Sequence, residues 1–218
     1  MGSAGQRVPF PDRQEAGRAL ARALGPRYGG RDEVIVLALP RGGVPVAYEV
    51  AKALGAPLDV FVVRKLGVPG HEELAMGAIA PGGVLVLDEG VVRPLGIDRD
   101  QIERVIVAEL RELERRETAY RGSRDPPDLA GKTVIIIDDG LATGATMRAA
   151  AEAVRRHQPS RIVVAVPVAS AQTCGELRGE VDEVVCLVTP EPFHAVGLWY
   201  DDFSPTGDEE VRALLTRA

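Results

Sequence analysis

VIIIDDGLATGAT, residues 134–146, is the stretch of this 218-residue chain that says most about its fold. Its first four residues are branched and apolar, which is typical of a strand buried on both faces. Two adjacent carboxylates, Asp138 and Asp139, follow, and a loop of small residues then leads into a helical pattern near Ala145. Because ligands bind at the carboxyl ends of parallel strands, this order predicts a ligand site directly after the strand.

The loop and the two acids suit different parts of a sugar phosphate. Amides that open a helix lack intrahelical partners, and the helix dipole adds positive potential, so the loop is expected to cradle a phosphate. Carboxylates repel a phosphate but accept hydrogen bonds from the vicinal hydroxyls of a ribose. A capped helix with no ligand is the alternative, but it needs fewer polar residues. The expected site comprises Asp138, Asp139, Gly140, Leu141, Ala142, Thr143, Gly144, Ala145 and Thr146.

Further apolar runs and helical patterns alternate along the chain. Strands are expected at 34–39, 58–63, 84–87, 134–137, 162–168 and 184–188, and helices at 44–54, 147–157 and 171–178. This alternation predicts an α/β fold with a mainly parallel sheet flanked by helices. Residues 98–121 carry one apolar stripe among Glu and Arg, which predicts a long amphipathic helix. A last helix is expected at about 208–217.

Two more loops carry cations next to glycines or at a strand end. Arg41, Gly42 and Gly43 follow the first strong strand, where glycines let an anion approach the backbone and Arg41 supplies a forked donor. A plain glycine-rich turn is the alternative. Arg64 and Lys65 are expected to end the second strand, either facing the same anion or simply solvated.

Composition narrows the class of protein. Apolar residues make up 45% of the chain and charged residues 27%, so a real core can form. The net charge of −6 disfavours a non-specific nucleic-acid binder. No apolar run has the length of a signal peptide or a membrane span, so a cytoplasmic protein without membrane contact is expected. Cys174 and Cys186 are too few for a disulfide framework or a four-thiolate metal site.

Residues 134–146 resemble the motif with which type I phosphoribosyltransferases bind 5-phosphoribosyl-1-pyrophosphate (PRPP). Gly140 departs from that pattern, where a larger apolar residue is usual, and Ala145 departs mildly. The resemblance implies a core at residues 1–189 with the 98–121 helix inserted, and a small hood followed by a helix at 190–218. It also implies that residues 41–43 hold the pyrophosphate, often with a non-proline cis peptide.

The same resemblance implies a reaction. PRPP would transfer its phosphoribosyl group to a small nitrogenous base, with Mg²⁺-assisted release of pyrophosphate. Mg²⁺ would be held mostly by PRPP and water, with no protein ligand assigned directly. The catalytic candidates are Arg64, Lys65, Asp138 and Asp139. The 6-oxopurine branch of the family usually has Asp where this chain has Ala142, which disfavours such a base.

The resemblance also implies a loop that closes over PRPP, a hood over the base and a dimeric protein. Residues 68–75 would form a mobile loop that closes over PRPP, with His71 in it, and rejoin a strand near 76–79. Phe193, Trp199 and Tyr200 are candidates for a hood over the base, or else a small cluster beneath a loop or a dimer contact. A homodimer is expected.

Two alternatives to the transferase remain. One is a non-catalytic protein that senses PRPP or a nucleotide on the same fold. The other, a phosphoesterase using Asp138 or Asp139, would want metal-binding histidines, and the chain has only three histidines.

Overall fold

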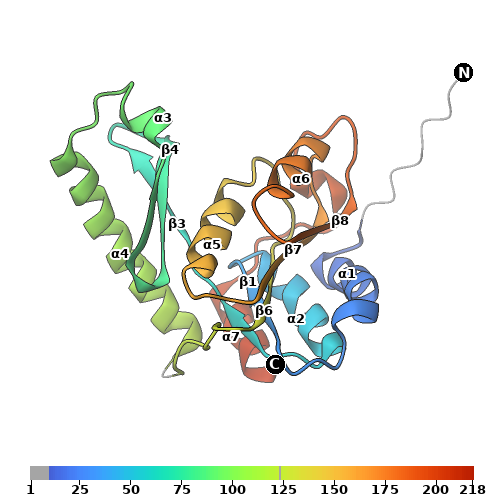
Figure 1. The fold of residues 1–218 in the computed structure, drawn as a ribbon. Helices are drawn as coiled ribbons and strands as arrows, with labels where there is room; N and C mark the ends of the chain where they lie inside the picture. The colour runs from blue at the N-terminus through green and yellow to red at the C-terminus, as the bar shows by residue number, and fades with distance from the viewer. Residues whose placement is uncertain (1–9, 123) are drawn as a thin grey trace, which may run out of the picture.

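A five-stranded parallel sheet forms the centre of the computed structural model, which describes residues 10–122 and 124–218 (Figure 1). The strands are β1 (Val34–Ala38), β2 (Leu58–Val60), β6 (Thr133–Ile137), β7 (Arg161–Val168) and β8 (Glu183–Val188), in the order β2-β1-β6-β7-β8. All four neighbouring pairs are parallel, which confirms the expected fold class. The carboxyl ends of β1 and β6 are therefore side by side.

Helices cover both faces of this sheet. Helices α1 (Arg13–Tyr28), α2 (Gly43–Leu54) and α7 (Asp208–Arg217) pack on one face, and α5 (Ala145–Arg155) and α6 (Ala171–Leu177) pack on the other. Alternate side chains of a strand point to opposite faces, so Ile135 joins the first layer and Ile136 the second. Burial on both sides explains why the strand sequences are apolar without alternation.

A second, antiparallel sheet lies beside the first and differs from the expected topology. It consists of β3 (Arg64–Val68), β4 (His71–Ala80) and β5 (Val84–Leu87) in that order, with η1 (Pro81–Gly83) between the last two. Residues 84–87 therefore do not belong to the parallel sheet. The second parallel strand stops at Val60, and Arg64 and Lys65 begin β3 instead of ending β2. Most of the expected loop at 68–75 is strand, because β4 already begins at His71.

The long helix is confirmed as α4 (Arg99–Arg121), which follows the short α3 (Glu89–Val92). Its start is fixed by a capping box in which the Asp98 and Gln101 side chains each accept the other residue's backbone N–H. The helix runs along the antiparallel sheet (Figure 1). At its end, Arg121 forms a buried ion pair with Asp59 of β2 at 3.0 Å, which ties the helix to the central sheet.

Helix α1 was not expected from the sequence. Its buried face combines the small residues Ala16, Gly17 and Ala21 with the larger Leu20, Leu24 and Tyr28. Gly17 permits close packing, because a Cβ there would lie 2.6 Å from the Val46 carbonyl oxygen of α2. A signal was nevertheless present, since the Asp12 side chain caps the helix by accepting the Glu15 N–H at 2.8 Å.

The C-terminal segment packs back onto the start of the described chain. After β8, the short helix η2 (Val196–Trp199) leads to Tyr200, which forms a parallel bridge with Phe10. The expected last helix is confirmed as α7. A disulfide, which the sequence analysis did not anticipate, joins Cys174 of α6 to Cys186 of β8.

Candidate functional site

The two glycine-containing loops singled out in the sequence meet at the carboxyl edge of the central sheet. β1 and β6 are neighbours, and the Leu39 N–H donates to the Ile137 carbonyl at 2.9 Å, so both chains leave the sheet together. The peptide bond between Pro40 and Arg41 is cis. Residues 41–43 and the acids that follow β6 thus form one surface.

Glycine is required at this junction because the acids leave no room for a side chain. A Cβ on Gly42 would lie 2.0 Å from Oδ2 of Asp139, far inside van der Waals contact. A Cβ on Gly43 would lie 2.7 Å from the Ile137 carbonyl oxygen and 3.2 Å from Oδ1 of Asp138. The backbone of the first loop therefore lies directly against both carboxylates.

The two acids have different surroundings. Oδ1 of Asp138 accepts the N–H of Asp139 at 2.8 Å. Burial, and then the neighbouring Asp139 charge, raise the pKa of Asp138 well above its ordinary value. Oδ2 of Asp139 instead accepts Nε of Arg13 at 2.9 Å. Burial also raises the pKa of Asp139, but the Arg13 cation opposes that rise.

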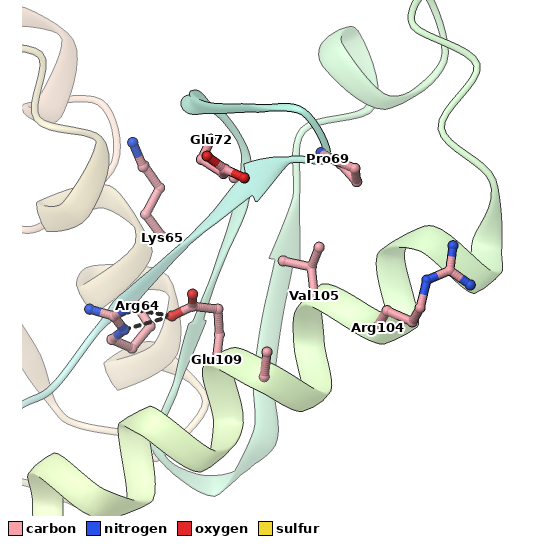
Figure 2. A pocket seen from close by; sticks show the side chains of 9 residues that line it. Arg64, Lys65, Pro69, Glu72, Arg104, Val105 and Glu109 are labelled. Atoms are coloured by element: carbon pink, nitrogen blue, oxygen red, sulfur yellow. Dashed lines mark hydrogen bonds and ion pairs between the residues drawn. The ribbon is translucent and has the colours of Figure 1, made fainter.

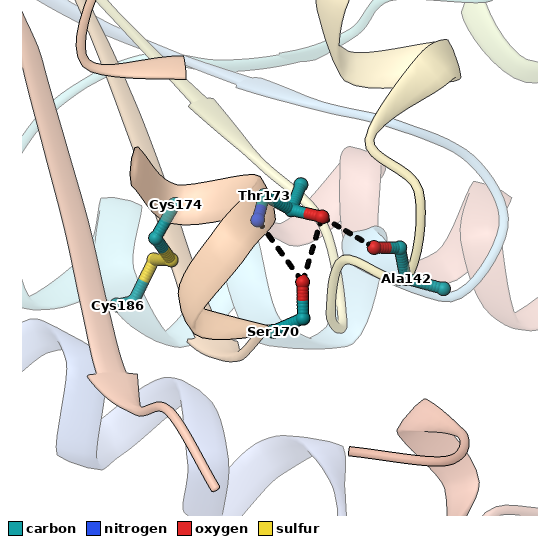
Figure 3. The surroundings of a disulfide bond; sticks show 5 residues. All are labelled: Ala142, Ser170, Thr173, Cys174 and Cys186. Atoms are coloured by element: carbon teal, nitrogen blue, oxygen red, sulfur yellow. Dashed lines mark hydrogen bonds between the residues drawn. A yellow bond between two sulfur atoms is a disulfide. The ribbon is translucent and has the colours of Figure 1, made fainter. Parts of the chain in front are cut away.

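The loop after the acids is fixed through its carbonyl groups. The Leu141 carbonyl accepts the N–H of Ser170 at 3.3 Å, and the Ala142 carbonyl accepts the Thr173 hydroxyl at 2.6 Å. The Thr143 carbonyl accepts Nη1 of Arg148 at 3.1 Å. Figure 3 shows the Thr173 hydroxyl of α6 between Ser170 and Ala142, one residue from the disulfide. Three successive carbonyls are thus turned into the protein.

The opposite side of this loop is open. Ala142, Thr143, Ala145 and Thr146 are exposed or partly exposed, whereas Gly144 is buried. Gly144 has φ +73° and precedes α5, and a Cβ there would lie 2.7 Å from Cγ2 of Thr173. The first amides of α5 have no acceptors within the helix, so an accessible, electropositive surface faces solvent. The place where a phosphate is expected is therefore accessible.

Gly140 has a packing role. A Cβ on Gly140 would lie 2.5 Å from Cγ1 of Val196 and 3.0 Å from Cγ1 of Val168. Val196, from η2, therefore takes the space that a larger side chain at 140 would fill. The C-terminal segment is directly coupled to the loop through this contact.

The expected anion-binding cations are not gathered in one place. Arg41 lies at the loop with its side chain 47% exposed, 3.7 Å from Asp208. Arg64 pairs with Glu109 of α4 at 2.6 Å, and Lys65 donates to the Glu73 carbonyl at 3.1 Å. Figure 2 shows Arg64 directed at Glu109, with Lys65 on the other side of β3. The two side chains diverge because successive residues of a strand point to opposite faces.

A hollow of about 420 Å³ lies between the β3–β4 hairpin and α4 (Figure 2). Its lining includes the cations Arg64, Lys65 and Arg104 and the acids Glu72 and Glu109, so most of its charge is compensated. This balance does not favour a highly charged ligand there.

The aromatic candidates form a packed cluster. Trp199 and Tyr200 are buried with Ala16 and Val168, and Phe193 packs against them. The Tyr200 hydroxyl donates to the Asp139 carbonyl, and its ring contacts Phe203. Tyr200 thus supports the backbone of Asp139, and both Trp199 and Tyr200 are too buried to present an open face to a base.

A metal ion at this site would need ligands from outside the protein. Within residues 10–122 and 124–218, no three His, Cys, Asp or Glu side chains gather in a way that could hold one. Asp138 and Asp139 alone make an incomplete donor set. They fit a divalent cation whose other ligands come from a bound phosphate ester and water.

Three residues that shape the site are not predicted from the sequence: Arg13, Thr173 and Val196. Each reaches the loop from an element distant in sequence, and none belongs to a recognisable motif. Only Arg13 had a local signal, because it directly follows the capping residue Asp12.

The sequence and the structure are similar to those of several known proteins. A family model described as "Phosphoribosyl transferase domain" matches residues 12–201. A Mycobacterium tuberculosis protein named "Putative phosphoribosyl transferase" is 50% identical over 209 residues, which are 96% of this chain and 47% of that protein. This chain thus spans about half the length of these curated relatives.

Two further relatives cover different shares of the chain. The crystal structure of TT1426 from Thermus thermophilus has a TM-score of 0.84 and 45% identity, and the match covers 96% of this chain and 99% of that one. A Chloroflexus aurantiacus protein named "Bifunctional protein PyrR" is 35% identical over 129 residues, which are 58% of this chain and 65% of that protein.

Proposed function

The chain belongs to the phosphoribosyl transferase domain family, and we propose that it transfers the 5-phosphoribosyl group of PRPP to a nitrogenous base with release of pyrophosphate. The observation that carries this proposal is the contact between the two loops, where Gly42 and Gly43 lie against Asp139 and Asp138. A single PRPP molecule would then place its pyrophosphate on the first loop and its phosphorylated ribose on the second. No single-loop phosphate site would need that contact.

Each part of the site has a role in this proposal. The exposed amides and hydroxyls of residues 142–146 bind the 5-phosphate, and Asp138 accepts hydrogen bonds from ribose hydroxyls. The backbone of residues 41–43 and the Arg41 guanidinium bind the pyrophosphate. Lys65 reaches the same group when the hairpin moves toward the loops.

The chemistry is a substitution at C1 of the ribose. A base nitrogen forms the new bond while the bond from C1 to the pyrophosphate oxygen breaks, and the electron pair leaves with pyrophosphate. The base loses its proton to water. Negative charge grows on the leaving group, so the cations of Arg41 and Lys65 lower the barrier electrostatically. Mg²⁺, when bound through PRPP oxygens and water, offsets part of the same charge.

We propose that the acceptor is a base other than a 6-oxopurine. The support is Ala142, an exposed methyl side chain at the loop where the 6-oxopurine branch has a carboxylate. The segment at 190–203, which contacts Gly140 through Val196, is the part of the chain proposed to cover such a base. Within it, Phe193 is less buried than Trp199 and Tyr200.

A PRPP-sensing protein without turnover is the second candidate. The observation that favours it is the Arg64–Glu109 ion pair, which holds one expected cation away from the loops. Incubation with PRPP, Mg²⁺ and a panel of purine and pyrimidine bases separates the two candidates. We expect pyrophosphate release with at least one base. PRPP binding without release for any base would support the sensor instead.

Two expectations about the protein's setting are also proposals. No helix in the described part of the chain is long and apolar enough to cross a membrane. We propose a homodimer in the cytoplasm, with the exposed Leu95 and Val107 near and on α4 as candidate contacts. Light scattering on the purified protein measures the oligomeric state.

The cellular location is tested through the two cysteines. Because disulfides are rare in reducing compartments, a count of free thiols at Cys174 and Cys186, after alkylation in the cells of origin, tests the location.

A further inference from the structure

Asp139 is enclosed by groups from three separate parts of the chain. Arg13, the first residue of α1, contacts its carboxylate, and Gly42 of the first loop lies against the same oxygen. Tyr200 donates to its carbonyl from the C-terminal segment. The side chains of Arg13 and Asp139 are only 11% and 15% exposed, so their ion pair is largely shielded from water. Such a pair is strongly oriented and weakly screened by salt.

Arg13 is itself held by several contacts. Its Nη1 donates to the Ser204 carbonyl at 2.8 Å, and its guanidinium lies 4.0 Å from the centre of the Phe203 ring. The backbone around it is fixed as well, because residues 10 and 11 pair with residues 199–202 through three hydrogen bonds. The cation therefore has a defined position before any ligand binds.

The two acids are held by different kinds of partner. Oδ2 of Asp139 is engaged by Arg13, whereas Asp138 uses Oδ1 for a bond within its own loop. Without Arg13, two adjacent buried carboxylates would face each other with no counter-charge. Repulsion would then favour rotation of Asp139 toward solvent, and this rotation would alter the surface that Gly42 and Gly43 complete.

We propose that Arg13 is a positioning residue for PRPP binding, acting through Asp139 to hold the acid pair against the 41–43 loop. This inference rests on the proposed function. It assigns a role to helix α1, and it separates the two acids, with Asp139 as the anchored member and Asp138 as the one that faces the sugar.

A double-mutant cycle tests this role. The Kd of Mg²⁺–PRPP is measured by calorimetry for the wild type, Arg13→Gln, Asp139→Asn and the double variant. We expect each single change to weaken binding roughly 10- to 100-fold, because small displacements of binding groups are costly. If Arg13 acts through Asp139, the double variant binds about as weakly as Asp139→Asn alone, so the two effects do not add.

Two further variants separate positioning from a general loss of stability. Arg13→Lys keeps the charge beside Asp139 and is expected to recover most of the affinity. Arg18→Gln removes another α1 arginine, one that pairs with Glu15 and Glu49 on the surface, and is expected to leave the Kd unchanged. Thermal unfolding of every variant checks that the fold is intact.

The outcomes distinguish this inference from the proposed function. Additive losses in the double variant, or no loss in Arg13→Gln, would overturn the role of Arg13 while PRPP binding by the wild type stands. Failure of the wild type to bind Mg²⁺–PRPP would overturn the proposed function and this inference with it.

Discussion

At the scale of single residues, Asp138 shows how a binding group can weaken the fold that carries it. Its carboxyl is partly buried and lies beside a second acid, and both facts raise its pKa. A raised pKa means that the folded protein holds this proton more tightly than the unfolded chain does. The contribution of Asp138 to stability therefore falls as the pH rises from the ordinary Asp value of 3.8 through the raised value.

We expect Asp138→Asn to stabilise the protein at pH 8, by about 1 kcal/mol for each unit by which the pKa is raised, and to change little at pH 4. The amide can still accept the Asp139 N–H, so that hydrogen bond is kept. Urea unfolding at both pH values measures the difference, with the exposed Asp32→Asn as the control. A variant less stable than the wild type at pH 8 would contradict this account of the burial.

The residues of the candidate binding loop could be selected from the sequence because they are consecutive. Asp138, Asp139 and Thr143–Thr146 form a local pattern whose chemistry can be read without knowing the fold. Arg13, Thr173 and Val196 were not predictable, because their roles depend on which elements the fold brings to the loop. The Gly140 departure from the family pattern is explained only once Val196 is seen to fill that space.

At the scale of elements, the alternation of side chains along a strand explains why Arg64 and Lys65 point in opposite directions. Both cations were expected at the end of a parallel strand, near the pyrophosphate. Instead, β3 begins at Arg64, and the two side chains point to opposite faces of the strand. Arg64 shares its face with the buried Leu66 and Val68, the side that packs toward α4. Lys65 is exposed on the other side.

This division predicts different effects for the two cations. We expect Lys65→Ala to lower kcat more than it lowers PRPP affinity, because its contact would form mainly as charge grows on the leaving group. Arg64→Ala is expected to lower the free energy of unfolding by about 1 kcal/mol through loss of the Glu109 pair, with a smaller effect on kcat. Steady-state kinetics and urea unfolding measure both. A kcat loss for Arg64→Ala equal to that for Lys65→Ala would refute the division.

Helices and strands were predicted more accurately where the local sequence pattern was strong. Helix α4 was predicted within one residue, because a capping residue and a long apolar stripe define it. The strand predicted near 76–79 lies within β4, but the hairpin itself was not predicted, because its strands are rich in small and charged residues and its turn at Pro69 and Gly70 is also typical of a loop. Helix α1 was not predicted, although Leu20, Leu24 and Tyr28 repeat every four residues on its buried face, because small residues make up the rest of that face and Pro26 lies within the helix.

At the scale of the whole molecule, the site is assembled from both ends of the described chain. Residues 10–13 pair with residues 199–204, and both contact the acids that follow β6 in the middle of the sequence. This arrangement makes the terminal segments part of the candidate site and not only of its support. The fold class could be predicted from the alternation of strands and helices, whereas this closure required the tertiary structure.

The central claim is that the bend after β6 binds a phosphorylated ribose, with the acids toward its hydroxyls and the amides toward its phosphate. Calorimetric titration of Mg²⁺–PRPP into the wild type and into Asp138→Asn with Asp139→Asn tests it most directly, with Glu209→Gln and Glu210→Gln together as an exposed control pair. We predict binding by the wild type and by the control, and a loss of at least about 100-fold in the acid-pair variant, whose circular dichroism spectrum stays that of the wild type. Equal affinity in the acid-pair variant and the wild type would contradict the claim.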